Sequence, residues 1–400
     1  MGRSRNNCKQ RPGVRLYGLS MTTDANSPKY STPHRIGGLT RLADNELPQA
    51  PPAPVRAAVA DHVQLNRYPE PHSAALVTAL ADHLRTPPEQ IMLGAGSSSI
   101  LQRLTRILCT SPDDAVLWTT PAFDAFGTFA RQAGVRAQQV PHSGGGTLDL
   151  DAVLTAVTPA TRMVIVVNPH NPTGAVARTA ALREFLNTID DNVTVVLDEA
   201  YRDFVTDPDV PDGVELARAR WAAGSGNVAV VRTFSKAHGL AGVRIGYGVA
   251  PTDLARRIRD AAIPREVSTT GQIAGLAALA SRTSTDRNIA RVVAERTRVV
   301  VELRRIGYAP SESHGNFVWL QLAEDSGRFA AHCYDDGVLV QDLAGHGVRV
   351  TVGTPADNDG FLRSAHTWIT GRPSLMSPRD SPRGLAPGGA SEHGSPPALC

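Results

Sequence analysis

Lysine is scarce in this 400-residue chain. Of the 41 basic residues only Lys9, Lys29 and Lys236 are lysine, so the remaining 38 are arginine. Codon bias in a GC-rich genome explains such a replacement wherever positive charge alone is needed. A lysine amine can lose its proton, whereas an arginine guanidinium stays protonated. Lys236, the one lysine in the long central body of the chain, is therefore a candidate for amine chemistry.

Cysteine and long apolar runs are also lacking. The four cysteines (Cys8, Cys109, Cys333, Cys400) form no CxxC pair, which argues against a disulfide framework or a structural zinc site and favours a reducing, cytoplasmic environment. No apolar run approaches the roughly 18–20 residues that cross a bilayer. The basic N-terminus is not followed by a hydrophobic segment, so we expect neither a signal peptide nor a membrane partner.

An excess of charge of one sign is missing as well. Lys+Arg total 41 against 38 Asp+Glu, and the net charge of +3 argues against a nucleic-acid-binding surface. The 42% hydrophobic content excludes a fully disordered chain and suffices for one large domain or two smaller ones. We expect residues 1–30 to form a dispensable arm, with Met21 an alternative start. The segment 371–400, rich in Pro, Gly and Ser, should be a disordered tail.

Short apolar runs in the middle of the chain predict strands buried on both faces of a parallel sheet. They are Met163–Val167, Val193–Leu197 and Val228–Val231. Helical patterns at Ala177–Leu186 and Ser97–Leu108 separate or precede them. In the second of these, Arg103 and Arg106 are expected to face away from the apolar stripe. Alternating strands and helices predict an α/β fold with a mostly parallel central sheet.

Beyond about residue 275 the pattern changes to that of a smaller α+β unit. A long amphipathic helix is expected at Asp286–Ile306. Short strands should follow at Phe317–Leu322, Val338–Val340 and Val348–Val352, with a helix near Arg328–Tyr334. The Pro-rich segment Pro48–Pro54 is assigned to the same layer. We therefore expect a small domain made of residues 31–64 and 276–370, and a large domain at 65–275.

Dense polar motifs follow each of the three buried strands. Their sequences are NPHNPTG at 168–174, DEAY at 198–201, and TFSK at 233–236 followed by GLAGVR at 239–244. Ligands of open parallel sheets bind outside the carboxyl ends of the strands. The side chains of these motifs are thus expected to converge on one crevice.

These residues resemble the fold-type I pyridoxal-phosphate (PLP) aminotransferases, most closely the histidinol-phosphate and aromatic amino acid aminotransferase group. The resemblance runs from about Asn45 to Leu362. It rests on RYPEP (67–71), GAGSSS (94–99), NPHNPTG, DEAYRDF (198–204), RTFSKAHGLAGVRIGY (232–247), GNFVWL (315–320) and VRVTVG (348–353). It implies a PLP-dependent homodimer that exchanges an amino group between an amino acid and a 2-oxo acid (EC 2.6.1 type).

The resemblance implies roles around the cofactor ring. Lys236 would bind PLP covalently and move the proton during turnover, which requires a primary amine. Asp198 would pair with the pyridine nitrogen and keep the ring an electron sink. Asn171 and Tyr201 would hydrogen-bond the phenolic oxygen. Phe126 occupies the place where the family usually has a stacking tyrosine, and would stack without the hydroxyl.

Phosphate and substrate contacts are implied in the same way. Gly96 and Ser97, at the start of a helix, would bind the phosphate through backbone N–H groups, with Ser235 and Arg244 completing the cup and Thr233 beside them. Tyr68 would reach the phosphate of the opposite subunit. Arg349 would grip the substrate α-carboxylate with its bidentate fork. Asn316 and Gln341 would also bind substrate.

The substrate side chain is where the sequence departs from the family. Histidinol-phosphate enzymes have an arginine at the position of Gln341, and a neutral amide clamps phosphate poorly. We therefore expect an aromatic substrate, or a specialised polar or cationic one if Glu266 lies near the pocket. The more direct interpretation places Arg265 and Glu266 on the surface.

Two alternatives stay open. One is a PLP lyase or decarboxylase on the same scaffold, since NPHNP with His170 also occurs in carbon–sulfur lyases. The other is a PLP-binding regulator without turnover. No helix-turn-helix is apparent in the sequence, and Lys236, Asp198 and Arg349 are all present, so the regulator is disfavoured.

Overall fold

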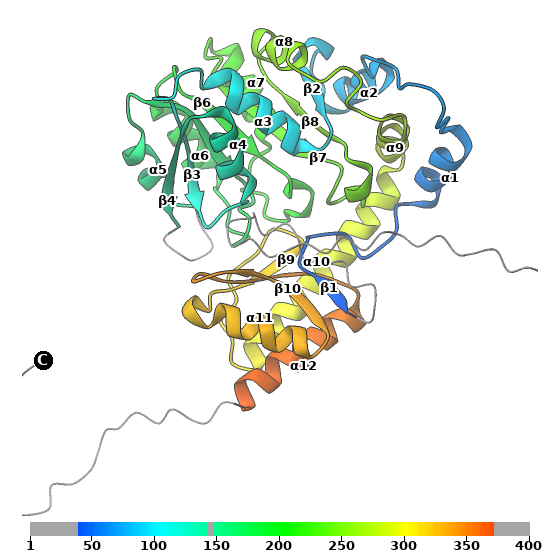
Figure 1. Ribbon diagram of the computed structural model, residues 1–400, viewed down its shortest axis with the longest axis vertical. Coiled ribbons are helices and arrows are strands. Elements are labelled where there is room, and N and C mark those ends of the chain that lie inside the picture. Colours follow the sequence, from blue (N-terminus) through cyan, green and yellow to red (C-terminus); the bar gives the residue numbers. More distant parts are fainter. Residues whose placement is uncertain (1–38, 143–147, 372–400) are drawn as a thin grey trace, which may run out of the picture. The chain divides into compact units, whose positions relative to one another are not determined.

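The structure is a computed structural model that describes residues 39–142 and 148–371 (Figure 1). The expected N-terminal arm, and the expected tail beyond residue 371, lie outside these ranges. Among the described residues, no helix combines the length and apolar composition that crossing a membrane requires.

A seven-stranded sheet forms the framework of the larger part of the chain. Its strands lie in the order β2-β8-β7-β6-β5-β3-β4. They are β2 (Ile91–Gly94), β3 (Ala115–Thr120), β4 (Arg136–Pro141), β5 (Thr161–Val167), β6 (Thr194–Asp198), β7 (Val228–Thr233) and β8 (Gly246–Val249). Among these seven strands, β8 alone runs in the opposite direction to the rest. The α/β fold with a mostly parallel sheet is thus confirmed.

Helices cover both faces of this sheet, as Val-rich strands without alternation predict (Figure 1). On one face lie α2 (Ala74–Leu84), α5 (Leu150–Ala156), α6 (Thr179–Thr188), α7 (Gly213–Ala222) and α9 (Thr269–Ala280). On the other lie α3 (Ser97–Leu108), α4 (Ala125–Ala133) and α8 (Thr252–Asp260). In β5, Val164 and Val166 pack on the first face and Ile165 on the second. Short 3₁₀ turns complete the elements: η1 (Pro88–Gln90), η2 (Arg202–Phe204), η3 (Ala241–Val243) and η4 (Ala323–Asp325).

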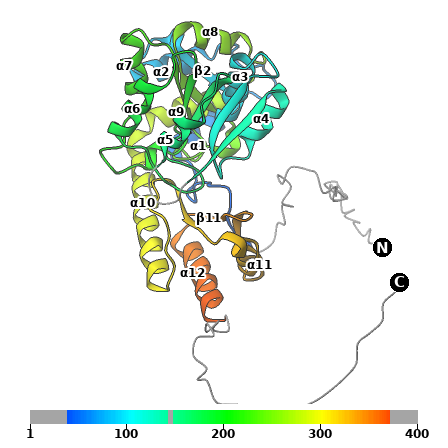
Figure 2. The same ribbon diagram turned by 90° about the vertical axis from the view of Figure 1, so that its left-hand side faces the viewer.

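A second, four-stranded sheet has the order β1-β10-β11-β9. It consists of β1 (Thr40–Leu42), β9 (Phe317–Leu320), β10 (Val338–Leu343) and β11 (Gly347–Thr351), and packs with α10 (Arg282–Arg305), α11 (Ser326–Asp335) and α12 (Pro355–Thr370) (Figures 1 and 2). Alternation divides its two faces: Val348 and Val350 join the helix-covered core, so Arg349 between them points the other way.

Residues 40–62 do not all pack with the small sheet: β1 does, whereas α1 (Ala53–His62) packs with the large sheet. Residues of β1 pair with β10 of the small sheet. Val55 of α1, however, is fully buried in the core of the large sheet, and Val59 packs against the same core. Because α1 buries its apolar side against α9, the Pro-rich segment Pro48–Pro54 leads away from the small sheet rather than belonging to its layer.

Candidate active site

Lys236 lies in a tight turn that follows β7. The turn is closed by two backbone hydrogen bonds, Gly239 N to Lys236 O (3.0 Å) and Leu240 N to Phe234 O (3.1 Å). Lys236 Nζ donates to the carbonyl of Asp44 (2.9 Å) and lies 5.9 Å from the centroid of the Tyr201 ring. Burial, helped by the charge of Arg349, lowers the pKa of the amine to about 7. The amine is therefore poised to lose its proton near neutral pH.

Asp198 is the last residue of the neighbouring strand β6. Its carboxylate is buried, and Oδ1 accepts from the amide of Ala200 (3.2 Å). Burial raises its pKa to about 6. Within residues 39–142 and 148–371, no cation forms an ion pair with it. A buried carboxylate without a counter-ion is costly, and the protonated pyridine nitrogen of PLP is a cation that would pair with it.

Tyr201 and Asn171 are held by a network from the small sheet and the β1 segment. Tyr201 Oη accepts from Asn45 Nδ2 (2.9 Å), and the ring packs edge-on against Phe317 (5.0 Å between centroids). Asn171 Oδ1 accepts from Arg349 Nη1 (2.6 Å). The strand-end motifs of the large sheet thus meet the small sheet at one site.

Arg349 is positioned to bind an anion. Its guanidinium lies 5.8 Å from the centroid of the Phe317 ring, and its buried Nε has no hydrogen-bond partner in the described part of the chain. No carboxylate of residues 39–142 or 148–371 forms an ion pair with it, and burial lowers its pKa. A buried donor left unpaired costs about 1–3 kcal/mol. A substrate carboxylate would satisfy it.

The N-terminus of α3 provides the predicted phosphate cradle. No side chain caps this helix, so its first N–H groups remain free to bind an anion. Gly96 has φ +82°, and a Cβ there would lie only 2.6 Å from an Arg244 nitrogen; a Cβ on Gly246 would meet Ser97 N. The structure thereby brings Gly96, Ser97 and Arg244 together, and only glycines permit this close approach.

Ser235 and Thr233 lie in the turn next to this cradle. The amide of Ser235 donates to Thr233 Oγ1 (3.0 Å), which itself donates to Ile245 O (3.5 Å). The hydroxyl of Thr233 is therefore engaged within the turn. Ser235 Oγ makes no hydrogen bond with the described residues and stays available for a phosphate oxygen.

A buried ion pair between Arg103 and Glu266 lies next to the cradle. From the sequence, both side chains were expected to face solvent. Arg103 does not face solvent: it is 7% exposed, its Nη2 donates to Leu93 O (2.6 Å) and pairs with Glu266 (2.8 Å). Glu266 is not a surface charge either, because its side chain is only 12% exposed beside Arg103. With its charge balanced by Arg103, Glu266 does not lend its carboxylate to a cationic substrate.

This ion pair gives the first testable prediction. Glu266→Gln leaves the Arg103 guanidinium buried without a counter-ion, so we expect the free energy of unfolding to fall by about 3 kcal/mol, with weaker PLP binding. Urea unfolding monitored by circular dichroism measures the change. Arg265→Gln, at the exposed neighbouring position, is the matched control and should alter stability by less than about 0.5 kcal/mol. Equal stability of the two variants would contradict a supporting role.

The structure does not favour Phe126 as the stacking residue. Its ring is 1% exposed and packs edge-on against Trp118 and Phe123, within the core beneath α4. Periodicity cannot distinguish a core aromatic from one that lines a site. Phe123, directly after β3 at the carboxyl edge of the sheet and only half-buried, is better placed to stack on a cofactor ring.

Three further predicted residues have different surroundings. Asn316 is completely buried, and its amide donates to Asn45 O (3.0 Å), so it positions Asn45, while its Oδ1 has no hydrogen-bond partner among the described residues. Gln341 lies directly opposite Arg349 in the β10–β11 ladder, on the same face of the sheet. Tyr68 is 87% exposed beneath the guanidinium of Arg265, and within the described chain it contributes nothing to the cradle.

Asn45 is the residue that sequence reasoning missed. It is fully buried at φ 52°, bonds Tyr201, and is anchored by Thr351 Oγ1 (3.1 Å to its Oδ1) and by Asn316. Its neighbour Asp44 supplies the carbonyl that holds Lys236. The only local sequence signal for this role is the asparagine itself, because asparagine tolerates left-handed backbone. Asparagines of this kind are common in turns, so the signal does not identify a site residue.

Comparisons with known proteins agree with this geometry. The family of class I and II aminotransferases matches residues 38–364. An aromatic amino acid aminotransferase from Thermobifida fusca (strain YX) is 44% identical over 333 residues, covering 83% of this chain and 91% of the relative. One from Streptomyces avermitilis is 41% identical and covers 81% of this chain and 89% of its own.

A solved structure shares the fold. The histidinol-phosphate aminotransferase from Sinorhizobium meliloti in complex with pyridoxal-5'-phosphate superposes with a TM-score of 0.76 at 24% identity, covering 87% of this chain and all of that chain (100%). The unpaired Asp198, the uncapped helix beside Arg244 and the readily deprotonated Lys236 are the partners that PLP requires. The chain belongs to the class I and II aminotransferases, PLP-dependent enzymes that exchange an amino group between an amino acid and a 2-oxo acid.

Proposed function

We propose that this aminotransferase acts on amino acids with aromatic side chains and on the corresponding 2-oxo acids. The observation that carries the proposal is the guanidinium of Arg349, which has a free buried donor and no acidic partner among the described residues. The neutral Gln341 lies directly opposite it and offers no second cation for a phosphate ester. Phe317 and Trp319 line the same face of β9, and the relatives at 44% and 41% identity bear the name of aromatic amino acid aminotransferases.

We assign a role to each residue that the geometry brings together. PLP, when bound, supplies an electron sink that makes the substrate Cα proton removable. Lys236 carries the cofactor and then holds or moves that proton at its Nζ. Asp198 would keep a positive charge at the pyridine nitrogen, and Asn171 and Tyr201 would hydrogen-bond the phenolic oxygen. The α3 N-terminus, Ser235 and Arg244 hold the phosphate, and Phe123 supports the ring.

A substrate panel tests the proposal. The purified holoenzyme is assayed with phenylalanine, tyrosine, tryptophan, histidinol phosphate, arginine and leucine against a common 2-oxo acid. We expect kcat/KM for the aromatic amino acids to exceed that for the others by at least about tenfold, the scale that a few apolar contacts provide. The highest kcat/KM with histidinol phosphate or with arginine would contradict the proposal.

Lys236 gives a prediction on pH. Only the neutral amine attacks the aldehyde of PLP, and burial lowers the pKa of Lys236 to about 7. The rate at which the apo-protein binds PLP should therefore rise with pH through a midpoint near 7 instead of near 10. Arg349→Gln removes a positive charge that contributes to this lowering, so its midpoint should be higher. Stopped-flow absorbance measures the rates.

The control for this measurement is Arg256→Gln, which removes an exposed charge on α8. Its midpoint should match that of the wild-type protein. A wild-type midpoint above 9 would show that the amine is not activated by its surroundings.

Product analysis separates transamination from the alternative reactions on this scaffold. With an amino acid donor alone, an aminotransferase releases one equivalent of the 2-oxo acid per active site and then stops. Continuous release of ammonia would indicate a lyase, and continuous release of carbon dioxide a decarboxylase. We expect a single equivalent and neither gas.

We further propose a homodimer in the cytoplasm. Large apolar side chains are exposed at Leu65 (92%), Tyr68 (87%) and Ile263 (73%), as is common where a surface meets a partner. The two described cysteines, Cys109 and Cys333, are free and buried. Light scattering coupled to gel filtration should give twice the mass of the chain, and a monomer that retains full activity would contradict the dimer.

A further inference from the structure

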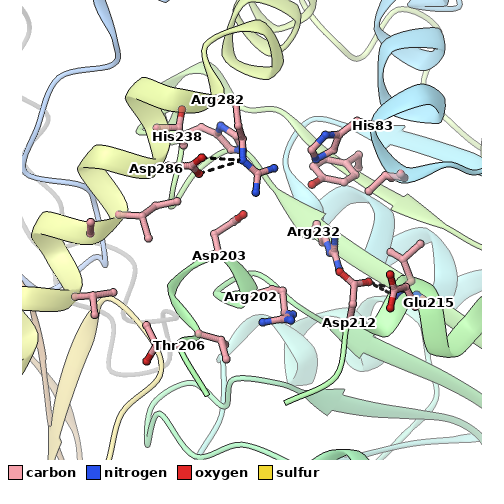
Figure 3. A pocket seen from close by; sticks show the side chains of 18 of the residues that line it. His83, Arg202, Asp203, Thr206, Asp212, Glu215, Arg232, His238, Arg282 and Asp286 are labelled. Carbon is pink, nitrogen blue, oxygen red and sulfur yellow. Dashed lines mark hydrogen bonds and ion pairs between the residues drawn. The ribbon is translucent and has the colours of Figure 1, made fainter. Parts of the chain in front are cut away.

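A second cavity lies away from the residues that bind cofactor and substrate. It has a volume of about 800 Å³, in the range of small-molecule sites. Its walls come from the end of α2, from η2, α7 and the β7–β8 pair, and from the first half of α10 (Figure 3). Lys236, Asp198 and Arg349 are not among the residues that line it. The cavity is thus separate from the active site.

The cavity nevertheless touches the turn that carries Lys236. His238, in the same turn, is 8% exposed, lines the cavity and packs on Phe234 (4.9 Å between centroids). Its Nδ1 is buried and has no hydrogen-bond partner in the part of the chain that the structure describes. His238 thus links the wall of the cavity to the turn that carries Lys236.

One wall of the cavity offers guanidinium N–H donors that no described residue engages. Arg282 Nε donates to Asp286 (3.0 Å to Oδ1), but the terminal nitrogens of Arg282 have no partner within residues 39–142 and 148–371. Figure 3 shows this guanidinium projecting into the open space.

The facing wall offers free negative charge. Asp203 makes no hydrogen bond or ion pair with the described residues, and in Figure 3 it points into the space below Arg282. Of the other three carboxylates, Asp212 is paired with Arg232 (2.9 Å) and Asp286 with Arg282, whereas Glu215 forms no ion pair with the described residues either. The lining holds five arginines against four carboxylates, so its field does not favour a polyanion. It suits a ligand that carries one charge of each sign.

Apolar side chains complete the cavity. They are Leu84, Val205, Val214, Ile289 and Val293. We propose that this cavity binds a free α-amino acid with an apolar side chain, its carboxylate on Arg282, its ammonium on Asp203 and its side chain against α10. The ligand would thus lie against the back of the turn that presents Lys236.

Equilibrium dialysis with phenylalanine tests the proposal in a protein whose active site can neither bind nor convert the amino acid. The Arg349→Gln holoenzyme, reduced with borohydride so that its cofactor is fixed and unreactive, serves as the reference protein. We expect it to bind about one phenylalanine per chain with millimolar or better affinity. Adding Arg282→Gln or Asp203→Asn should weaken this binding at least tenfold. Adding Arg287→Gln, five residues further along α10 and outside the lining, should leave it unchanged.

Two analogues distinguish recognition of both charges from recognition of one. N-acetylphenylalanine lacks the ammonium, and phenethylamine lacks the carboxylate. Each should bind the reference protein at least tenfold more weakly than phenylalanine. Binding of N-acetylphenylalanine as tight as that of phenylalanine would reveal a simple anion site and overturn the proposal. Saturable binding that survives both cavity substitutions, or none below about 10 mM in a protein with native circular dichroism, would also overturn it.

Discussion

Lys236→Arg should lower turnover by about 10⁴-fold or more and abolish the visible absorbance of the bound cofactor. Arginine keeps the positive charge and much of the reach of lysine, but its guanidinium cannot lose its proton and so cannot bond the cofactor. The loss of the proton-moving group alone accounts for about 10²–10⁴-fold. Steady-state kinetics and absorbance spectra measure both effects.

An exchange of the opposite kind is the control. Arg256→Lys, at an exposed position on α8 where only charge is used, should leave turnover and stability unchanged. The wild-type chain has only three lysines. Comparing Lys236→Arg with Arg256→Lys therefore tests whether lysine and arginine are interchangeable on the surface but not at position 236. If Lys236→Arg retained more than about 1% of turnover, the assignment of Lys236 would fail.

The framework of the fold could be predicted because its signals are local. Strands buried on both faces must be apolar throughout, and β5, β6 and β7 follow the expected runs to within a few residues. Their carboxyl ends lie at one edge by the geometry of parallel strands. The polar motifs after those strands consequently meet at one site.

Residues that depend on contacts far along the chain could not be predicted. Arg103 has the position of a solvent-facing residue on α3, yet Glu266, distant in sequence, draws it inward. Phe126 and Phe123 are near neighbours of the same type, and only tertiary packing decides which one is enclosed. Asn45 acts through four long-range hydrogen bonds that no local pattern encodes. The second cavity likewise arises from elements spread over two hundred residues.

Asp198→Asn should separate the needs of catalysis from those of stability. Asparagine keeps the shape and can still accept the hydrogen bond from Ala200, but it cannot hold a positive charge on the pyridine nitrogen. Loss of this electrostatic contribution should lower kcat by roughly 10²–10³-fold. The affinity for PLP should fall less, because the phosphate cradle at Gly96 and Arg244 is unchanged.

The same substitution should stabilise the apo-protein. Burial raises the pKa of Asp198 from 3.8 to about 6, so its ionisation destabilises the fold: the penalty is absent below about pH 4 and grows as pH rises until it is complete above about 6. A shift of about two units corresponds to about 3 kcal/mol. Urea unfolding of apo-proteins at pH 5 and pH 8 should therefore show Asp198→Asn more stable than wild type, by a larger margin at pH 8. A variant that is inactive but no more stable at pH 8 would mean that Asp198 already has a partner within the protein. A variant both more stable and catalytically impaired would show that the fold retains a costly buried charge because the cofactor needs it.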